Sequence, residues 1–411
     1  MRPLRPARGT VAVALAACLA AFLAARCSGD PPDVTASRAA ATPSATVGGT
    51  VGGAAGGATP SPAPSRRTVT LVATGDVLLH EQLWEQARRD APPAAGDEAM
   101  DFAPMLAAIR PQVSGADVAL CHLETPLAAA GGPYRGYPSF SGPPEIVPAL
   151  KATGYDACTT GSNHTFDAGA AGVDRTLDAL DAGGLAHAGS ARSAVEAART
   201  TVVDAGGTKV AVVSYTYGFN GSSYPGGDRW RANVIDADRI RAAARQARKR
   251  GAEIVVVALH WGTEYRHDPN AQQRELAPEL ARSPDIDVLI GHHAHVVQPI
   301  ERIGRTWVVY GLGNLIAWHS TPGPANAEGL LVRFTFTEQP GGNGRFAVTA
   351  AEYEPLLVAR DAPIRLLDVR EALETRSYGS SSAARLRTAL LRTTKVVTSR
   401  GAAADGLAPL R

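Results

Sequence analysis

The sequence predicts an α/β domain built around a mixed β-sheet. Short, solidly apolar runs rich in Val, Ile and Leu are typical of strands that are buried on both faces. These runs alternate with longer segments of helical periodicity, which is the order expected of a layered α/β domain. Three other segments are predicted to be hairpins, two of them with turns at glycines, so the sheet is expected to contain antiparallel as well as parallel strands.

The elements follow in chain order from Thr68. Apolar runs predict strands over residues 68–73, 116–121, 254–259 and 287–290. Helical periodicity predicts helices over 170–182 and 236–250. Hairpins are expected over 201–217, which turns at Gly206 and Gly207, over 300–312, which turns near Gly304, and over 330–357. We place this domain at 68–366. The remaining residues, 367–411, are expected to form a tail with one helix over 382–394 and a frayed end.

The first 27 residues have the layout of a secretory signal. Three arginines within the first eight residues precede an uncharged apolar run over residues 9–25. This run is short for a membrane-spanning helix, which needs about 20 apolar residues. Cys18 and Cys27 each end a segment that resembles a bacterial lipobox, so both are candidates for lipidation. An ordinary secretory signal and an uncleaved anchor are the alternatives.

Residues 28–67 are predicted to be a flexible tether. They consist largely of Ala, Thr, Ser, Pro and Gly and show no apolar periodicity from which a core could form. A Gly-rich coil of this length spans on the order of 35 Å. We therefore expect an exported domain held a short distance from the outer face of the cytoplasmic membrane.

The overall composition is that of a soluble globular protein. Of the 411 residues, 45% are hydrophobic, and the mean hydropathy is −0.07. A formal net charge of +2 gives no support for nucleic-acid binding, which usually requires a basic patch or stripe.

The histidines gather at the predicted ends of strands. All ten lie between His80 and His319, and six of them directly follow a predicted strand: His122, His164, His260, His292, His293 and His295. In open α/β sheets, functional groups collect beyond the carboxyl ends of the strands. This placement therefore indicates a functional site.

Five segments carry the polar residues of this site: 74–76, 121–126, 160–167, 260–265 and 291–298. Together they offer Asp, Glu, Asn and His side chains, whose nitrogen and oxygen atoms suit Zn, Mn or Fe. None offers the paired thiolates of a structural zinc site. Any one segment alone would be explained as well by a turn or a helix cap. Five in one series favour a metal site.

This series resembles the CapA family, which is associated with poly-γ-glutamate capsule synthesis and is similar in fold to the calcineurin-like metallophosphoesterases. The resemblance extends from about Thr68 to Trp318. It is carried most closely by residues 139–156, which lead into Asn163 and His164, and by residues 310–314. It implies a four-layer α/β/β/α sandwich of two mixed sheets with a metal centre at the strand ends.

The resemblance also implies roles for individual residues. It implies two divalent metal ions, Zn, Mn or Fe, held by Asp76, Glu124, Asn163, His260, His293 and His295. It implies that His164 acts as a proton donor oriented by Asp167. Further candidates to support the ligands or to meet the substrate are His122, Glu264, His292 and Asn314.

Alternatives exist at three places in the sequence. The family commonly has Asn where this chain has His122, which could add a ligand or support one. Alternation along an extended segment places His293 and His295 on one side, so His292 is expected to point away. Cys121 and Cys158 end neighbouring predicted strands, and either a disulfide or two free buried thiols is consistent with an exported protein.

The resemblance implies a metal-dependent hydrolase of the phosphoesterase type that acts in the biosynthesis of a capsule or another cell-envelope polymer. The expected substrate is an anionic polymer or a phosphoester. Membrane-bound polymer synthesis proteins and the membrane itself, through an N-terminal lipid or anchor, are the expected partners. The alternative is a non-catalytic factor for polymer export or anchoring that retains the metal site. Nucleotide scavenging ranks last, because no aromatic-rich second domain is visible after Trp318.

Overall fold

The computed structural model describes residues 66–96, 99–319, 323–341 and 343–410. The predicted secretory signal, the lipidation candidates Cys18 and Cys27, and nearly all of the predicted tether lie outside the described residues. Among the helices that are described, none has both the length and the apolar character needed to cross a membrane.

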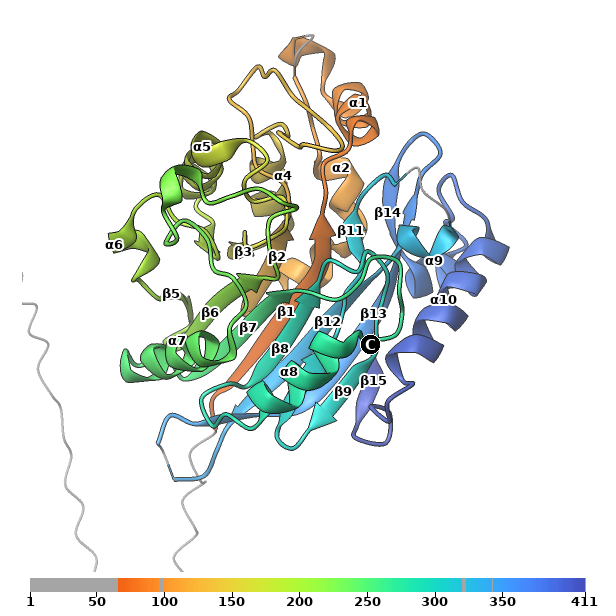
Figure 1. Ribbon diagram of the computed structural model, residues 1–411. Helices are drawn as coiled ribbons and strands as arrows, with labels where there is room; N and C mark the ends of the chain where they lie inside the picture. The colour runs from red at the N-terminus through yellow and green to blue at the C-terminus, as the bar shows by residue number, and fades with distance from the viewer. Residues whose placement is uncertain (1–65, 97–98, 320–322, 342, 411) are drawn as a thin grey trace, which may run out of the picture. The chain divides into compact units, whose positions relative to one another are not determined.

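Two mixed β-sheets form the centre of the domain (Figure 1). The first sheet has the order β14-β13-β12-β1-β2-β3-β4, with β11 paired to β1 and β15 paired to β13. Its strands are β1 (Thr68–Val77), β2 (Val118–Leu123), β3 (Ala157–Thr159), β4 (Ala186–Ala188), β11 (Asn314–Ile316), β12 (Glu328–Glu338), β13 (Phe346–Ala359), β14 (Arg365–Asp368) and β15 (Leu407–Pro409).

The second sheet has the order β5-β6-β7-β8-β10-β9. Its strands are β5 (Thr201–Ala205), β6 (Thr208–Thr216), β7 (Ile254–His260), β8 (Val288–His292), β9 (Ile300–Ile303) and β10 (Thr306–Val309). The three predicted hairpins are confirmed as the antiparallel pairs β5-β6, β9-β10 and β12-β13. In each sheet the central strands run parallel, so their carboxyl ends lie at a common edge.

Helices cover the outer face of each sheet. Alternate residues of one strand face different layers: Ile254 and Val256 of β7 pack between the two sheets, whereas Val255 and Val257 pack against helices. This is why the strands read as continuous apolar runs. The first sheet packs against α1 (Glu81–Asp90), α2 (Ala103–Leu106), α3 (Arg110–Ser114), α4 (Ile146–Thr153) and α5 (Gly169–Ala182), and the second against α7 (Ala237–Lys249) and α8 (Ala271–Ala281). The predicted α/β fold of two mixed sheets is confirmed.

The C-terminal segment is more ordered than expected. The predicted helix is present as α10 (Ala383–Val397), which follows α9 (Val369–Thr375). We expected a frayed end after it, but β15 instead pairs in parallel with β13, with Leu407 opposite Ala351. A three-residue strand carries too little periodicity to be recognised from the sequence. Its apolar residue is buried by a partner far away in the chain.

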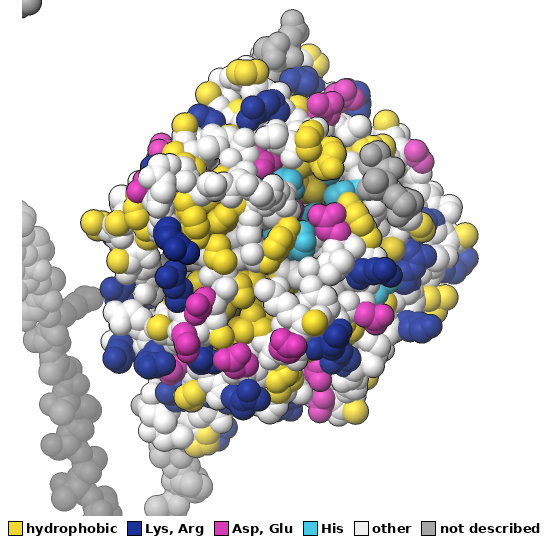
Figure 2. Space-filling view, in the orientation of Figure 1, with side chains coloured by type: hydrophobic (Ala, Val, Ile, Leu, Met, Phe, Trp, Pro, Cys, Tyr) yellow, Lys and Arg dark blue, Asp and Glu magenta, His cyan; other side chains and the backbone are white. Residues whose placement is uncertain are grey.

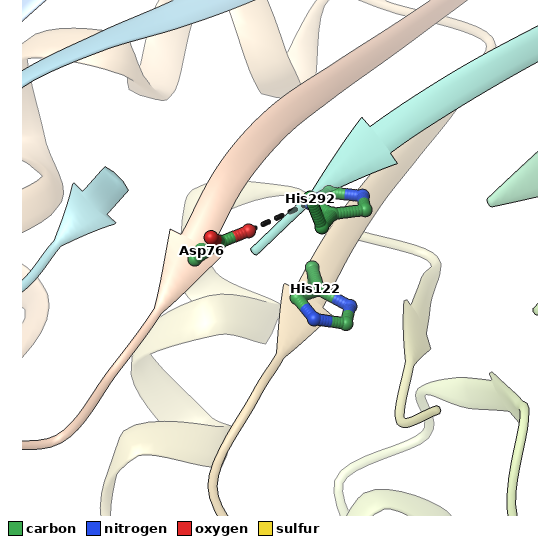
Figure 3. A group of neighbouring side chains, drawn as sticks. All are labelled: Asp76, His122 and His292. Atoms are coloured by element: carbon green, nitrogen blue, oxygen red, sulfur yellow. Dashed lines mark hydrogen bonds and ion pairs between the residues drawn. The ribbon is translucent and has the colours of Figure 1, made fainter. Parts of the chain in front are cut away.

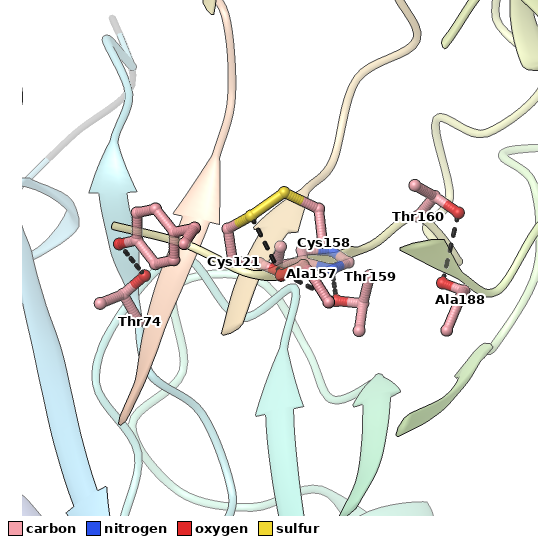
Figure 4. The surroundings of a disulfide bond; sticks show 9 residues. Thr74, Cys121, Ala157, Cys158, Thr159, Thr160 and Ala188 are labelled. Atoms are coloured by element: carbon pink, nitrogen blue, oxygen red, sulfur yellow. Dashed lines mark hydrogen bonds between the residues drawn. A yellow bond between two sulfur atoms is a disulfide. The ribbon is translucent and has the colours of Figure 1, made fainter. Parts of the chain in front are cut away.

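A disulfide joins the neighbouring strands β2 and β3 (Figure 4). Cys121 and Cys158 are register partners on these parallel strands, and their Cα atoms are 4.5 Å apart. Of the two alternatives left by the sequence, the structure therefore shows the bonded form.

Candidate metal centre

The predicted site residues meet because the parallel strands of both sheets end at one edge. In the first sheet, Asp76 of β1 is the register partner of His122 of β2. In the second sheet, His260 of β7 is the register partner of His292 of β8. The two sheets pack face to face, so the pairs contact one another across the interface. All four side chains are buried.

Asp76 is held by hydrogen bonds from the second sheet (Figure 3). Its Oδ1 accepts from Nδ1 of His292 at 2.8 Å, and its Oδ2 accepts from the backbone N–H of His293 at 3.0 Å. Burial opposes ionisation, but the hydrogen bonds from His292 and His295 outweigh it and lower the pKa of Asp76 well below its usual value. Asp76 is therefore a carboxylate at neutral pH.

The prediction that His292 points away from the site is wrong. His292 is the last residue of β8, and its ring binds Asp76 and stacks on the ring of His122 with centroids 4.1 Å apart. The chain does not continue as an extended strand, because His293 and His295 have φ angles of 89° and 53°. This left-handed backbone breaks the two-residue alternation, so all three histidines face the centre.

Glu124 gives the strongest indication that the centre binds a cation. It follows β2, is almost fully buried, and neither of its carboxylate oxygens has a hydrogen-bond partner among the described residues. Its Oε1 lies 3.7 Å from Nε2 of His295 and 3.9 Å from Nε2 of His260. Burial raises the pKa of Glu124 well above its usual value, although the neighbouring His295 opposes this shift. A buried carboxylate without partners is costly, and a bound cation would satisfy it.

Two further predicted ligands, His260 and His295, have amide oxygens beside them. Nε2 of His260 lies 2.8 Å from Oδ1 of Asn163, and Nδ1 of His295 donates to Oδ1 of Asn314 at 3.0 Å. Burial lowers the pKa of His260 well below its usual value. Burial also acts to lower the pKa of His295, but the carboxylates of Glu124 and Asp76 outweigh it and raise this pKa to about 9.

The structure thus brings all six predicted ligands to one buried place. Donor atoms lie within 4.8 Å of one another in three groups there: Asp76, His122 and His292; Asp76, Glu124 and His295; and Glu264, His293 and His295. Glu264 is exposed, whereas Nδ1 of the buried His293 has no partner in the described part of the chain. The residues present fit a divalent metal that prefers nitrogen and oxygen ligands.

The predicted proton-donor pair is present next to these groups. Nδ1 of His164 donates to Oδ2 of Asp167 at 2.7 Å, and the backbone N–H of Phe140 donates to the same oxygen at 2.8 Å. Both side chains are largely buried. Because Asp167 fixes Nδ1, Nε2 is the ring atom that can exchange a proton with a bound molecule.

Comparison with known proteins identifies the family. Residues 70–318 match the family described as bacterial capsule synthesis protein PGA_cap. The chain belongs to this family. The predicted resemblance to CapA proteins is therefore confirmed.

Two known proteins are moderately similar to this chain. The PGA biosynthesis protein CapA of Bacillus subtilis is 30% identical over 242 residues, which are 57% of this chain and 61% of that protein. A probable polyglutamine synthesis accessory protein of Mycobacterium tuberculosis is 28% identical over 262 residues, 59% of this chain and 67% of that protein. The match to the B. subtilis protein covers less than two thirds of its length.

Solved structures of phosphoesterases are more distant. A 5'-nucleotidase precursor from Thermus thermophilus is 17% identical, with 80% of this chain and 59% of that chain covered and a TM-score of 0.44. A calcineurin-like phosphoesterase from B. subtilis is 13% identical, with 79% and 99% covered and a TM-score of 0.39. Neither likeness is close enough to carry a conclusion about this chain.

Two partly exposed tyrosines, Tyr217 and Tyr265, form an aromatic rim around the metal centre of this PGA_cap protein. Tyr217 was not identified from the sequence. Tyr217, 38% exposed, lies with its ring 4.6 Å from that of His293, and Tyr265, 37% exposed, lies 6.0 Å from His295. Figure 2 shows histidine side chains reaching the surface beside hydrophobic and acidic ones. Tyr217 directly follows β6, and this strand-end position was the available signal. Trp261, by contrast, is fully buried in the core.

Proposed function

We propose that this protein is an exported, metal-dependent hydrolase of the phosphoesterase type that acts in the biosynthesis of an anionic cell-envelope polymer. Membership of the PGA_cap family and the names of the chain's relatives support a role in polymer biosynthesis, with poly-γ-glutamate as one polymer of this kind. The buried, unpartnered carboxylate of Glu124 among histidines is the observation that carries the metal dependence.

We infer that the centre holds two divalent ions, Zn, Mn or Fe, through the six converging residues Asp76, Glu124, Asn163, His260, His293 and His295. When bound, such ions polarise a phosphoryl or carbonyl oxygen and make hydroxide available near neutral pH. No serine or cysteine nucleophile is required for hydrolysis of this kind.

The chain's own residues supply the proton transfer and the substrate contacts. His164 can deliver a proton from Nε2 to the leaving group, because Nδ1 remains bound to Asp167. The backbone N–H of Phe140 holds the Asp167 carboxylate in place during this transfer. Tyr217 and Tyr265 present partly exposed rings at the rim, where the rest of the substrate would lie.

The test is hydrolysis by the purified chain after metal removal. The chain is stripped with a chelator, reloaded separately with Zn²⁺, Mn²⁺ or Fe²⁺, and assayed on a chromogenic phosphodiester and on poly-γ-glutamate, whose chain length is followed by gel electrophoresis. We expect turnover of at least one substrate that requires metal and is lost in His164→Asn. Tight metal binding without turnover of either substrate would contradict the hydrolase and support a non-catalytic factor for polymer export or anchoring.

The proposed location has its own test. We propose that the N-terminal segment exports the domain and anchors it to the outer face of the membrane, near membrane-bound polymer synthesis proteins. Membrane fractionation of cells that carry Cys18→Ser, Cys27→Ser or both substitutions would identify the lipidated residue. Retention of the double variant in the membrane fraction would contradict lipidation.

A further inference from the structure

We propose that His122 is a positioning residue that determines which ring nitrogen of His260 faces the metal, and that it is not a metal ligand itself. The inference rests on the proposed metal centre and assigns a role to a buried histidine that the proposed mechanism does not use.

The location of His122 suits this role. It lies on β2 between Asp76 of β1 and Thr159 of β3, which are its register partners. It is buried, and its ring stacks on His292 and lies 5.0 Å from the ring of His260, centroid to centroid. His122 therefore links the first sheet to two histidines of the second.

When Nε2 of His260 binds a metal, a chain of hydrogen bonds assigns one tautomer to each ring. The hydroxyl of Thr159 donates to the carbonyl of Cys121 at 3.4 Å, so its oxygen accepts from Nδ1–H of His122 at 2.8 Å. Nε2 of a neutral His122 then carries the lone pair and accepts from Nδ1–H of His260 at 3.0 Å. The first sheet thus selects one tautomer of His260.

This tautomer leaves the lone pair of His260 on Nε2. That atom faces Oδ1 of Asn163 at 2.8 Å and Oε1 of Glu124 at 3.9 Å. The amide of Asn163 is oriented in turn, because its Nδ2 donates to Oδ1 of Asn220 at 3.2 Å. Two oxygen atoms therefore lie within 4 Å of the lone-pair nitrogen of His260, and a cation is the occupant that fits such a set of donors.

The same bonds argue against His122 as a ligand. Both of its ring nitrogens are already engaged, one by Thr159 and one by His260. The neighbouring group of Asp76, His122 and His292 is close enough to hold an ion, but Nδ1–H of His292 already donates to Oδ1 of Asp76. This group is accordingly a support for the metal centre rather than a separate site.

The test compares metal binding by three substitutions in the full-length chain. His122→Phe keeps a flat ring for stacking on His292 but removes both hydrogen bonds. His122→Gln keeps an amide oxygen that can accept from His260. Thr159→Val removes only the group that fixes the His122 tautomer. Affinity and the number of ions bound are measured for Zn²⁺ and Mn²⁺ by competition with a chromophoric chelator.

We expect His122→Phe to weaken binding by about 10- to 100-fold, as is usual for partners that orient a ligand, with the number of ions unchanged. His122→Gln should recover part of this loss, and Thr159→Val should show a smaller one. Loss of one bound ion in His122→Phe would show that His122 is a ligand and would overturn the proposal. An affinity of His122→Phe within threefold of the wild type would also overturn it, because His122 would then have no effect on metal binding.

Circular dichroism of each variant checks that it is folded. If His122→Phe does not fold, Thr159→Val decides: weaker binding supports the positioning role, and unchanged binding overturns it. Failure of the proposed function looks different, because the wild-type chain itself would then bind no metal or hydrolyse nothing. The inference about His122 fails alone when wild-type binding is tight and the variants match it.

Discussion

Replacement of Glu124 by Gln should have opposite effects on the metal-free and metal-loaded protein. In the metal-free protein the Glu124 carboxylate is buried, and neither oxygen has a partner in the described part of the structure. Burial raises the pKa of Glu124, so the folded state resists the ionisation that the unfolded chain undergoes freely above its usual pKa. Its penalty therefore grows as the pH rises from the usual pKa to the raised pKa and is constant above that. Glu124→Gln removes this penalty and keeps the side-chain volume.

The size of both effects follows from the geometry. Leaving a buried group unpaired costs about 1–3 kcal/mol, and more when the group is charged, so replacing the charged Glu124 by the neutral Gln should stabilise the metal-free protein by about 1–3 kcal/mol at pH 8. At about 2 °C per kcal/mol for a domain of this size, the melting temperature should rise by roughly 2–6 °C. Loss of a carboxylate ligand should weaken metal binding by at least about tenfold, which is about 1.4 kcal/mol of metal-induced stabilisation.

Differential scanning fluorimetry with a chelator and with excess Zn²⁺ or Mn²⁺ measures both quantities. Glu354→Gln is a matched control. Glu354 is also buried, one of its oxygens has no partner among the described residues, and burial and the neighbouring Asp368 raise its pKa to about 9. It lies on β13 and not in the metal centre. Its substitution should leave the metal-induced shift unchanged. A lower melting temperature of metal-free Glu124→Gln together with an undiminished metal-induced shift would refute the reasoning.

Three other perturbations have defined outcomes. His164→Asn should lower kcat by about 10²- to 10⁴-fold with metal content unchanged, and an unaltered kcat would exclude acid catalysis by this residue. Metal-free protein should lose up to about 3 kcal/mol of unfolding free energy between pH 6.5 and 9 in urea titrations. The reason is that the pKa of His295 is raised to about 9 in the folded protein, so its protonated ring contributes its full stabilisation below the usual pKa of His and loses it as the pH rises to about 9. A flat profile of unfolding free energy against pH would contradict this. Cys158→Ser should cost about 2–4 kcal/mol in the same titrations, since the disulfide spans 37 residues, and a loss below 1 kcal/mol would show that the bond adds little.

The sequence predicted the layered fold because strands buried on both faces need apolar residues at every position. The run at β7 illustrates this: alternate residues serve different layers, so no gap interrupts the pattern. The convergence of the site followed from the same reasoning, since Asp76, His122, His260 and His292 all sit at the carboxyl ends of parallel strands. Position along a strand is a local property that a sequence reveals well.

What the sequence did not reveal depends on backbone angles and distant contacts. The orientation of His292 could not be inferred, because nothing in the run of histidines signals the left-handed backbone at His293 and His295. The strand β15 depends on a partner more than 50 residues away. Glu124 was predicted to be a metal ligand. Only the structure shows that neither of its carboxylate oxygens has a hydrogen-bond partner among the described residues.

The most direct test of the metal centre is anomalous diffraction from crystals of the chain grown with Zn²⁺ or Mn²⁺, together with elemental analysis of the same protein. We predict two ions per chain, with anomalous peaks within coordination distance of Asp76, Glu124 and His260. A chain that binds no ion would contradict the account. So would peaks only at the separate group of Asp181, His187 and Glu196, where Arg192 already pairs with both carboxylates.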